Sequence, residues 1–462
     1  MRFAIAAAAL AVTACAAVAP PAKKAAAVRI NEDPYPSTYV RYPGMPTLIR
    51  GATVYDGEGG RIEHGNVLIA DGVIKAVSGA LADLALPPGT VTIDATGKWV
   101  TPGIIDVHSH LGDYASPGVS ANDDGNEATA PARPDVWAEH SVWPQDPGFS
   151  RALANGGVTT LQILPGSANL FGGRSVVLKN VYGRSVMDMK FPGAPYGLKM
   201  ACGENPKRVY ANKGGPATRM GNIAVTRATW LKAQAYSRKW DKYEAAGGDM
   251  PERDLAMETL RGVLQGKILV HNHCYRADEM AIMIDLSKEF GYKISAFHHA
   301  VEAYKIADLL RDNGICAAMW ADWYGFKMES YDAIEQNIAF VDHAGACAIV
   351  HSDDANGIQR LNQEAAKAIA AGKRAGVAIS DASAWRWLSL NPAKALGISD
   401  RTGSLKPGKM ADVVLWNGDP FSVYTRPDRV WIDGALMYDA ADPKRRPVSD
   451  FELGQPGAGD VK

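Results

Sequence analysis

The chain has 462 residues, of which 47% are hydrophobic and 21% charged, and its formal net charge at pH 7 is −1. These values are typical of a globular protein long enough to bury a sizeable core. The balanced charge offers no basic surface for nucleic acid, and beyond the N-terminal region no segment reaches the roughly eighteen consecutive apolar residues of a membrane span. We therefore expect neither a nucleic-acid partner nor a transmembrane domain.

The first nineteen residues have the pattern of an export signal. An apolar run from Ala4 to Thr13 follows a single arginine, and the run is too short to remain as a membrane anchor. Residues 12–15 (VTAC) resemble the lipobox of bacterial lipoproteins, in which the cysteine, here Cys15, is acylated. Cleavage before Pro20 and release is the alternative. Both interpretations predict an exported, periplasmic protein, and only the first predicts a membrane contact, through a lipid on Cys15.

Both ends of the remaining chain predict antiparallel sheet. Between residues 46 and 101, short alternating apolar runs are separated by turn residues, and similar runs return at 410–416 and 430–434. We expect one discontinuous β-sandwich, in which Asp412 has a structural role. The predicted boundaries are a signal at 1–19, a linker at 20–45, the sandwich at 46–101 with 393–440, a barrel at 102–392 and a tail at 441–462.

Residues 102–392 alternate strand-like and helical patterns, which is typical of βα units around a parallel sheet. Strands are predicted at 104–108, 158–164, 175–181, 197–201, 267–271, 293–298, 316–320 and 347–351. Helices are predicted at 223–246, 252–265, 277–290, 301–312, 358–371 and 381–396. The predicted fold class is therefore α/β, a (β/α)8 TIM barrel. The Gly- and Pro-rich residues 165–222 are expected to form long loops over the mouth of the barrel.

Histidines gather where these strands end. His108 and His110 close the first strand, and residues i and i+2 of a strand face the same way, so both rings can reach one metal ion. Seven of the ten histidines in the chain lie in such clusters: His108, His110, His271, His273, His298, His299 and His351. Catalytic groups of TIM barrels lie at the carboxyl ends of the strands. The pattern predicts a metal site at the barrel mouth.

These clusters, with residues 102–110 (PGIIDVHSH), resemble the amidohydrolase superfamily, and within it imidazolonepropionase and prolidase-type Xaa-Pro dipeptidases. The resemblance covers roughly residues 46–440. It implies a metal-dependent hydrolase, with one or two divalent ions, most simply Zn²⁺, and metal ligands at His108, His110, His271, His299 and Asp353. His273 is the alternative to His271, and His298 is expected beside His299 as a packing neighbour. His351 is either an outer group of the site or a packed histidine.

Asp353 carries the proposed chemistry. Residues 350–353 (VHSD) occupy the place of the eighth-strand Gly-Thr-Asp of the family, where the aspartate is both metal ligand and proton acceptor. His351 and Ser352 depart from that pattern, and Asp354 is the alternative to Asp353. We expect Asp353 to take a proton from water and pass it to the leaving amine.

A bridge between two metal ions has two candidates. Lys199 lies inside an apolar strand, and its surroundings resemble those of the carboxylated lysine of isoaspartyl dipeptidase. Glu204 lies beyond the end of that strand and needs no modification. A carboxylated Lys199 and an unmodified Glu204 therefore remain equal predictions.

Substrate binding is predicted for Tyr275 and Arg219, and for His273 if it is not a metal ligand. An imidazole, a phenol or a guanidinium fork could each hold a carboxylate. Cys202, Cys274, Cys316 and Cys347 each lie in or beside a predicted strand. We expect them to be buried thiols, although export permits disulfides.

The expected reaction is hydrolysis of a C–N bond. Because an exported enzyme meets peptides, a peptide or an N-acyl amino acid is the first substrate expected. A cyclic amide hydrolase or deaminase of the imidazolonepropionase type is the alternative, and a non-catalytic binding barrel is the alternative outside the enzymes. The oligomeric state is open, with a homo-oligomer among the outcomes.

Overall fold

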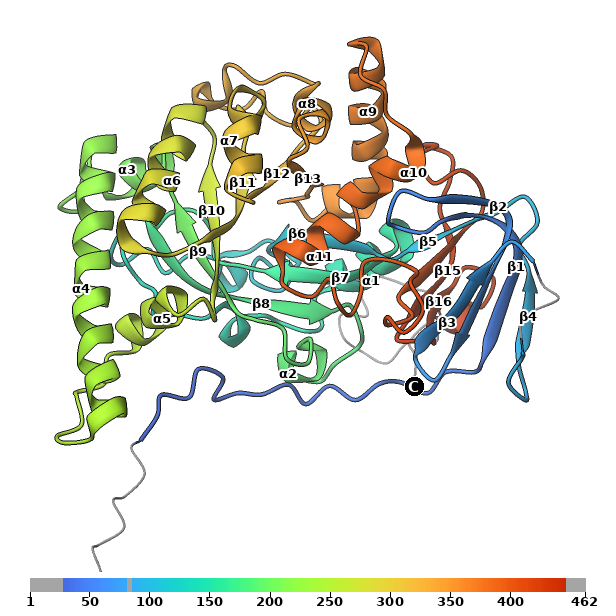
Figure 1. Cartoon of the computed structure of the whole chain (residues 1–462), viewed down its shortest axis with the longest axis horizontal. Coiled ribbons are helices and arrows are strands. Elements are labelled where there is room, and N and C mark those ends of the chain that lie inside the picture. Colours follow the sequence, from blue (N-terminus) through green and yellow to red (C-terminus); the bar gives the residue numbers. More distant parts are fainter. Residues whose placement is uncertain (1–27, 81–84, 446–462) are drawn as a thin grey trace, which may run out of the picture.

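The computed structural model describes residues 28–80 and 85–445, and the predicted signal and Cys15 lie outside them. An eight-stranded sheet in the order β13-β12-β11-β10-β9-β8-β7-β6 curves into a nearly closed barrel (Figure 1). Its strands are β6 (Ile104–Ser109), β7 (Val158–Ile163), β8 (Phe171–Lys179), β9 (Gly197–Ala201), β10 (Leu269–Cys274), β11 (Ile294–His299), β12 (Cys316–Met319) and β13 (Cys347–Val350). The predicted α/β barrel is confirmed.

One strand departs from the expected parallel arrangement. β8 runs antiparallel to both β7 and β9, and it begins earlier than the predicted strand at 175–181. Only seven or so residues separate β7 from β8, too few for the helical crossover that a parallel pair needs, so the chain turns straight back. The expectation of a uniform βα repeat was wrong at this strand.

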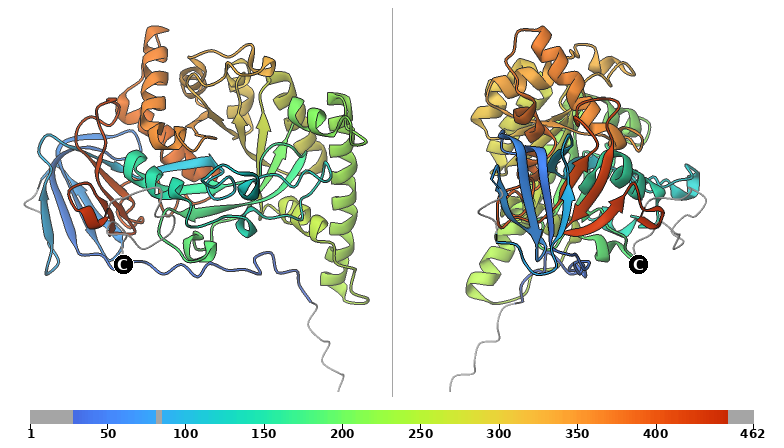
Figure 2. Two further views of the ribbon diagram at one scale, coloured as in Figure 1. Left: turned by 180° about the vertical axis from the view of Figure 1, so that it is seen from behind. Right: turned by 90° about the vertical axis from the view of Figure 1, so that its right-hand side faces the viewer.

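Helices cover the outside of the barrel. The α-helices are α1 (Pro147–Gly156), α2 (Val186–Met189), α3 (Glu204–Tyr210), α4 (Arg219–Ala246), α5 (Leu255–Leu264), α6 (Ala277–Phe290), α7 (Ala307–Asp312), α8 (Asn337–His343), α9 (Leu361–Arg374), α10 (Asp381–Ala384) and α11 (Leu390–Ala395). α4 stands at the end of the molecule farthest from the sandwich (Figures 1 and 2). Among the described helices, none combines the length and apolar character of a membrane span.

A second eight-stranded sheet joins the two ends of the chain, as predicted. It contains β1 (Thr47–Tyr55), β2 (Arg61–Ala70), β3 (Val73–Ser78), β4 (Val91–Asp94), β5 (Trp99–Pro102), β14 (Val413–Trp416), β15 (Pro427–Ile432) and β16 (Ala435–Asp439). β5 pairs with β14, so strands from opposite ends of the chain share hydrogen bonds. β5 also leads directly into β6, which ties the start of the barrel to this sheet.

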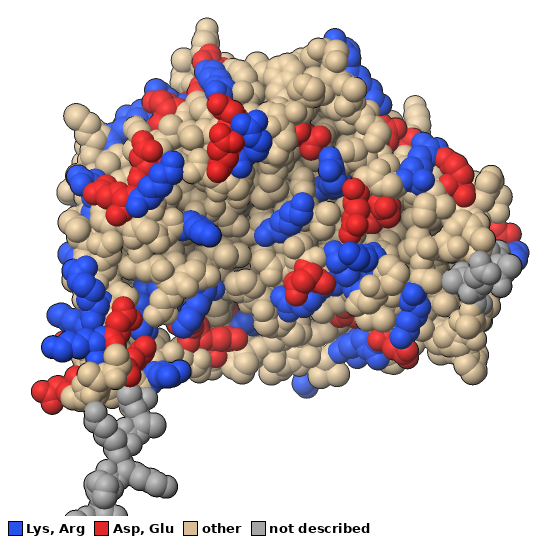
Figure 3. Space-filling view, viewed as in Figure 1, with Lys and Arg blue, Asp and Glu red and all other residues tan. Residues whose placement is uncertain are grey.

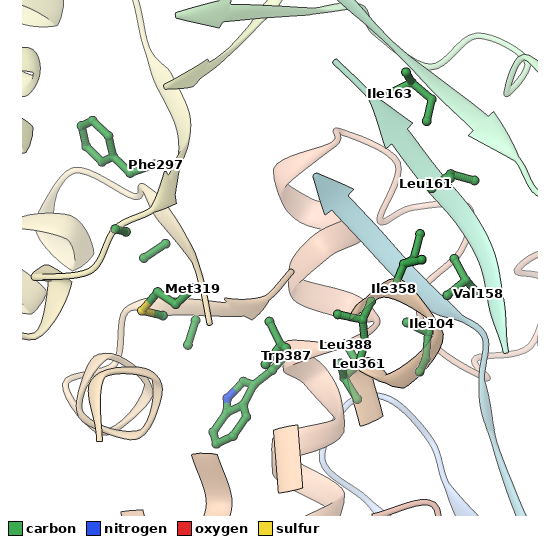
Figure 4. Close-up of a cluster of buried hydrophobic side chains, with 14 of the residues drawn as sticks. Ile104, Val158, Leu161, Ile163, Phe297, Met319, Ile358, Leu361, Trp387 and Leu388 are labelled. Atoms are coloured by element: carbon green, nitrogen blue, oxygen red, sulfur yellow. The ribbon is translucent and has the colours of Figure 1, made fainter. Parts of the chain in front are cut away.

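Apolar packing fills the space between the barrel and the helices that follow it. Ile104 on β6 lies beside Val158 on β7, and Ile358, Leu361 and Leu388 approach from the C-terminal helical region (Figure 4). All five side chains are fully buried. The first strand of the barrel therefore starts within a rigid core.

Buried charges join the two parts of the molecule. The Lys179 ammonium at the end of β8 lies 2.9 Å from Asp433 and 3.7 Å from Asp412, both on the sandwich side. Tyr39 donates a hydrogen bond to Asp433, and Thr402 donates one to Asp412. Removing one partner from a buried ion pair typically costs about 3–5 kcal/mol, because the other charge is left without compensation. Asp412 thus has the contacts of a structural residue.

The N-terminal segment 28–46 runs along the underside of the barrel as an extended strap (Figures 1 and 2). Ser37 donates to the Lys190 carbonyl, and the Lys190 ammonium pairs with Asp33 at 2.9 Å. Arg174 of β8 donates to the Glu32 carbonyl. The strap therefore reaches the sandwich while bound to the barrel.

The four barrel cysteines form two disulfides, Cys202–Cys274 and Cys316–Cys347, with Cα atoms 5.3 and 4.4 Å apart. The expectation of free thiols was wrong. Neighbouring parallel strands hold each pair at bonding distance, which the linear spacing of the cysteines does not reveal. The first disulfide joins the carboxyl ends of β9 and β10, and the second joins the amino ends of β12 and β13.

Candidate metal centre

Two histidines of β6 and one aspartate converge at the barrel mouth. Oδ1 of Asp353 lies 3.2 Å from Nε2 of His108 and 3.1 Å from Nε2 of His110. The ligand atoms of these three residues all lie within 4.8 Å of one another. Nδ1 of His110 contacts the Leu164 carbonyl at 2.8 Å, which leaves its Nε2 directed at Asp353. One divalent ion could contact all three side chains.

Backbone contacts set the position of Asp353. Its N–H donates to the His108 carbonyl at 2.9 Å, which joins the chain after β13 to β6. The Asp106 carboxylate accepts hydrogen bonds from the backbone N–H groups of His108 and Ser352 and from the Ser352 hydroxyl. Asp353 itself has φ of +58°, uncommon for a residue other than glycine. Ser352, which replaces the threonine of the family pattern, thus fixes the turn that aims Asp353.

The end of β11 brings two adjacent histidines into the barrel. His299 has φ of +69°, so its ring turns inward although its neighbour His298 already faces the interior. Nδ1 of His299 lies 3.1 Å from Nε2 of His351, and the ligand atoms of His108, His299 and His351 lie within 4.8 Å of one another. His351 is therefore part of the cluster. In the sequence, this location of His351 was indicated only by its position at the end of the predicted eighth strand.

His298 links two other histidines. Its Nδ1 lies 2.9 Å from Nδ1 of His108, and its Nε2 lies 2.9 Å from Nδ1 of His271. His271 extends toward the barrel floor, since its Cδ2 lies close to Gly197 near the start of β9. The buried Nε2 of His271 has no hydrogen-bond partner within the described residues. His271 thus lies below the mouth rather than at it.

His273 lies one layer above His271 on the same face of β10. Its ring lies 4.5 Å from that of His299, and both of its buried nitrogens lack hydrogen-bond partners within the described residues. The Tyr275 ring stacks on His299 at 5.2 Å and is 2% exposed. Both predicted substrate-binding residues therefore lie beside the histidine cluster.

The two bridge candidates are placed differently. The Lys199 ammonium on β9 is fully buried and lies 3.4 Å from Nε2 of His108. Glu204 begins α3 and borders a separate cavity of about 630 Å³, where its carboxylate lies 3.9 Å from the Lys327 ammonium. The structure brings Lys199, and not Glu204, next to the histidines.

Arg219 is already paired. Its guanidinium lies 3.0 Å from Glu279 and 2.9 Å from Glu329. It borders the cavity that Glu204 lines, and not the one that contains the histidines. Its donors are therefore directed at carboxylates of the protein.

Burial controls the charge of the cluster. Burial, with the nearby Lys199 charge, lowers the pKa of His271 to about 3, and burial holds the pKa of His108 and His299 well below the usual range. Burial also lowers the pKa of Lys199 to about 7. Burial alone would raise the pKa of Asp353, but the hydrogen bond from His110 and the nearby imidazoles bring it below the usual range. The site thus offers neutral imidazoles and an ionised carboxylate.

A cavity of about 390 Å³ opens onto this cluster. Its lining includes Lys199, His299 and Asp353, together with Tyr114, Asn126 and Ser167 from the long loops over the mouth. Asn126 donates to the Tyr114 hydroxyl at 2.5 Å. Sequence reasoning missed these three residues, and their only signal was the unusual length of the loops that carry them.

The donor set fits a divalent first-row metal ion. Such ions bind neutral imidazole nitrogens and carboxylate oxygens, and both are grouped here within reach of one another. The buried ring nitrogens of His273 without partners are a second indication, because buried polar atoms in proteins rarely lack one. His108, His110, His299, His351 and Asp353 are the residues in this arrangement.

Comparison with known proteins gives consistent results. A sequence profile of the amidohydrolase family matches residues 99–437. Amidohydrolase tasK from Hapsidospora irregularis is 33% identical over 438 residues, which cover 87% of this chain but 44% of tasK, so the chain spans less than half of that relative. A crystal structure of an amidohydrolase from Thermotoga maritima is 36% identical, with a TM-score of 0.77, over 85% of this chain and all of that one.

A prolidase solved with N-methylphosphonate-L-proline shares the fold at 18% identity, with a TM-score of 0.52 over 85% of this chain and 99% of that chain. The family profile spans most of the chain, and the histidines and aspartate of the cluster lie within it. The chain therefore belongs to the amidohydrolase family, and its barrel contains a histidine-rich cluster that could hold a divalent metal ion.

Proposed function

We propose that this protein is an exported amidohydrolase that cleaves the amide bond of a peptide or an N-acyl amino acid. The observation that carries the proposal is the convergence of His108, His110 and Asp353 at the mouth of an accessible cavity. Zn²⁺ is the metal we propose, because it suits imidazole and carboxylate ligands and has no redox chemistry of its own.

The metal ion and the residues around it would have separate roles in the reaction. A divalent ion held by His108, His110 and Asp353 would supply Lewis acidity toward a carbonyl and would lower the pKa of water. Asp353 accepts the proton of that water and delivers it to the departing nitrogen, a role worth about 10²–10⁴-fold in rate. The hydrogen bonds from the backbone N–H groups of Ser352 and His108 to Asp106 hold the residue before Asp353 against β6 for this transfer.

Hydrogen-bond geometry favours His273 over His271 as the ligand from β10. A neutral imidazole has one donor and one acceptor nitrogen, so His298 accepts from one of His108 and His271 and donates to the other. The ring that accepts at Nδ1 carries its proton on Nε2 and cannot bind metal there. If Nε2 of His108 binds the metal ion, its Nδ1 donates to His298 and His298 donates to Nδ1 of His271. His271 then keeps its proton on Nε2, and His273 supplies the free nitrogen.

We also propose that Lys199, once carboxylated by CO₂, would help to hold a second metal ion. Lys199 is buried and lies 3.4 Å from His108, and it forms no ion pair within the part of the chain that the structure describes. Burying a free ammonium is costly, whereas a carboxylated lysine would be neutralised by two metal ions.

Export is proposed from two observations. The N-terminal pattern ends in Cys15, and the barrel contains two disulfides. Structural disulfides persist mainly in oxidising compartments such as the bacterial periplasm. A lipid on Cys15 would then hold the protein at the membrane.

The function is tested by turnover of a library of dipeptides, N-acyl amino acids and cyclic amides by zinc-loaded protein. We expect hydrolysis of linear amides, and a loss of at least about 10²-fold in kcat for Asp353→Asn. Asp354→Asn is the matched control and should stay near wild type. Turnover of cyclic amides alone would reject the proposed substrate class, and no turnover at all would favour the binding barrel.

The β10 ligand is tested by metal content after dialysis. His273→Ala should lose bound metal, because a ligand nitrogen is removed. His271→Ala should retain it, since that ring lies below the mouth. The reverse result would assign the ligand to His271.

The bridge is tested with two variants. Lys199→Ala should bind one fewer metal ion and regain activity when short carboxylic acids are added, because they replace the missing carboxylate. Glu204→Gln should keep both ions. Metal loss in Glu204→Gln alone would move the bridge to Glu204.

Export is tested by labelling with palmitate in a bacterial host. The wild-type protein and Thr13→Ser, which retains the cysteine, should both incorporate label. Cys15→Ser should not, because the acylated sulfur is missing. Equal labelling of all three proteins, or of none, contradicts the lipid anchor.

A further inference from the structure

The loop between β12 and α8 brings a lysine close to the metal centre. The Lys327 side chain is 13% exposed, and its ammonium lies 3.8 Å from the centre of the Tyr275 ring. That ring in turn stacks on His299. A single aromatic ring therefore separates the ammonium from a candidate metal ligand.

The contacts of this ammonium are long. Within the described residues, its oxygen neighbours are Glu329 and Asn205 at 3.5 Å and Glu204 at 3.9 Å. Strong hydrogen bonds from an ammonium to a carboxylate measure about 2.7–2.9 Å. The Glu329 atom that faces Lys327 is Oε2, at 3.5 Å, while Oε1 accepts from Arg219 and from the backbone N–H of Glu204. Lys327 thus retains donor capacity for an additional anion.

Aromatic side chains continue outward from the same point. The Phe326 ring lies 6.0 Å from the Lys327 ammonium, and Trp323 packs 5.7 Å from Phe326. These two residues are 55% and 43% exposed, which is unusual for rings of this size. Trp320, which contacts both of them, packs on His299 at 4.4 Å. The exposed Phe326 and Trp323 rings are therefore backed by Trp320, which is 4% exposed and reaches His299.

We propose that Lys327, Phe326 and Trp323 form the subsite for the leaving half of the substrate, an amino acid with a free α-carboxylate and an apolar side chain. The proposal rests on the amide hydrolysis proposed above. In such a substrate the carboxylate follows the scissile nitrogen by one Cα, about 4 Å from the scissile carbon by standard backbone dimensions. The carboxylate pairs with the ammonium, and the apolar side chain packs on the two exposed rings.

The subsite is tested first by equilibrium binding, which does not depend on turnover. Hydrocinnamate carries the carboxylate and the phenyl ring of the leaving half, and hydrocinnamamide lacks the charge. By calorimetry on metal-loaded protein, we expect Lys327→Met to weaken hydrocinnamate binding about 10- to 100-fold, the range for a lost hydrogen bond to a charged group, and to leave the amide unchanged. Trp323→Ala should weaken binding of both ligands.

Lys305→Met is the matched control. Lys305 lies on the neighbouring cavity and is paired with Asp332 at 2.5 Å, so its removal should not change either affinity. Unchanged hydrocinnamate binding in Lys327→Met would falsify the role of the lysine. Unchanged binding in Trp323→Ala would overturn the apolar part and leave the rings free to contact another protein.

Kinetics separate this inference from the proposed function. If linear amides are hydrolysed, Lys327→Met should raise KM for N-acetyl-phenylalanine and leave the KM of its amide unaltered. If the wild type hydrolyses no linear amide but the binding differences hold, the proposed function fails and the anion subsite stands. If turnover is normal and both KM values rise together, the subsite is rejected.

Discussion

The metal centre depends on imidazoles that remain neutral because they are buried. Burial lowers the pKa of His108, His273, His298 and His299 well below the usual range. A neutral ring has one donor and one acceptor nitrogen, so each hydrogen bond in the cluster decides which nitrogen remains for a metal. The contacts of His298 with His108 and His271 thereby influence residues at two depths of the barrel. At this site, the packing of the imidazoles therefore also determines which of their nitrogens can bind a metal ion.

The scaffold around the cluster is reinforced where the ligands lie. The chain after β13 is bound to β6 through Asp106, and a disulfide joins the carboxyl ends of β9 and β10. β8 reverses direction between β7 and β9, and none of these three strands contains a histidine. Site residues on rigid strands are held more precisely than residues on loops. The loops over the mouth supply instead the residues that would contact substrate.

Charge pairing links this scaffold to the rest of the molecule. Lys179 connects the end of β8 to two aspartates of the sandwich region, and Lys190 connects the barrel to the strap through Asp33. On the face shown in Figure 3, acidic and basic side chains are interspersed, in agreement with the net charge of −1. The buried pairs therefore have a different role from the surface charges. The buried Lys179 pairs fix the sandwich against the barrel, since an uncompensated buried charge is costly. The pair between Lys190 and the strap is partly open to solvent, because the Asp33 side chain is 43% exposed.

The sequence by itself determined the barrel, the sandwich built from both ends, the family and the position of His108, His110 and Asp353 at strand ends. These features follow from local information, namely alternation along a strand and the motifs that accompany it. Only the tertiary structure decided the direction of β8, the two disulfides, the separation of Glu204 from the histidines and the approach of Lys327 to Tyr275. Each of these depends on which strands and loops lie side by side, because contacts between distant segments leave no periodic pattern in the chain.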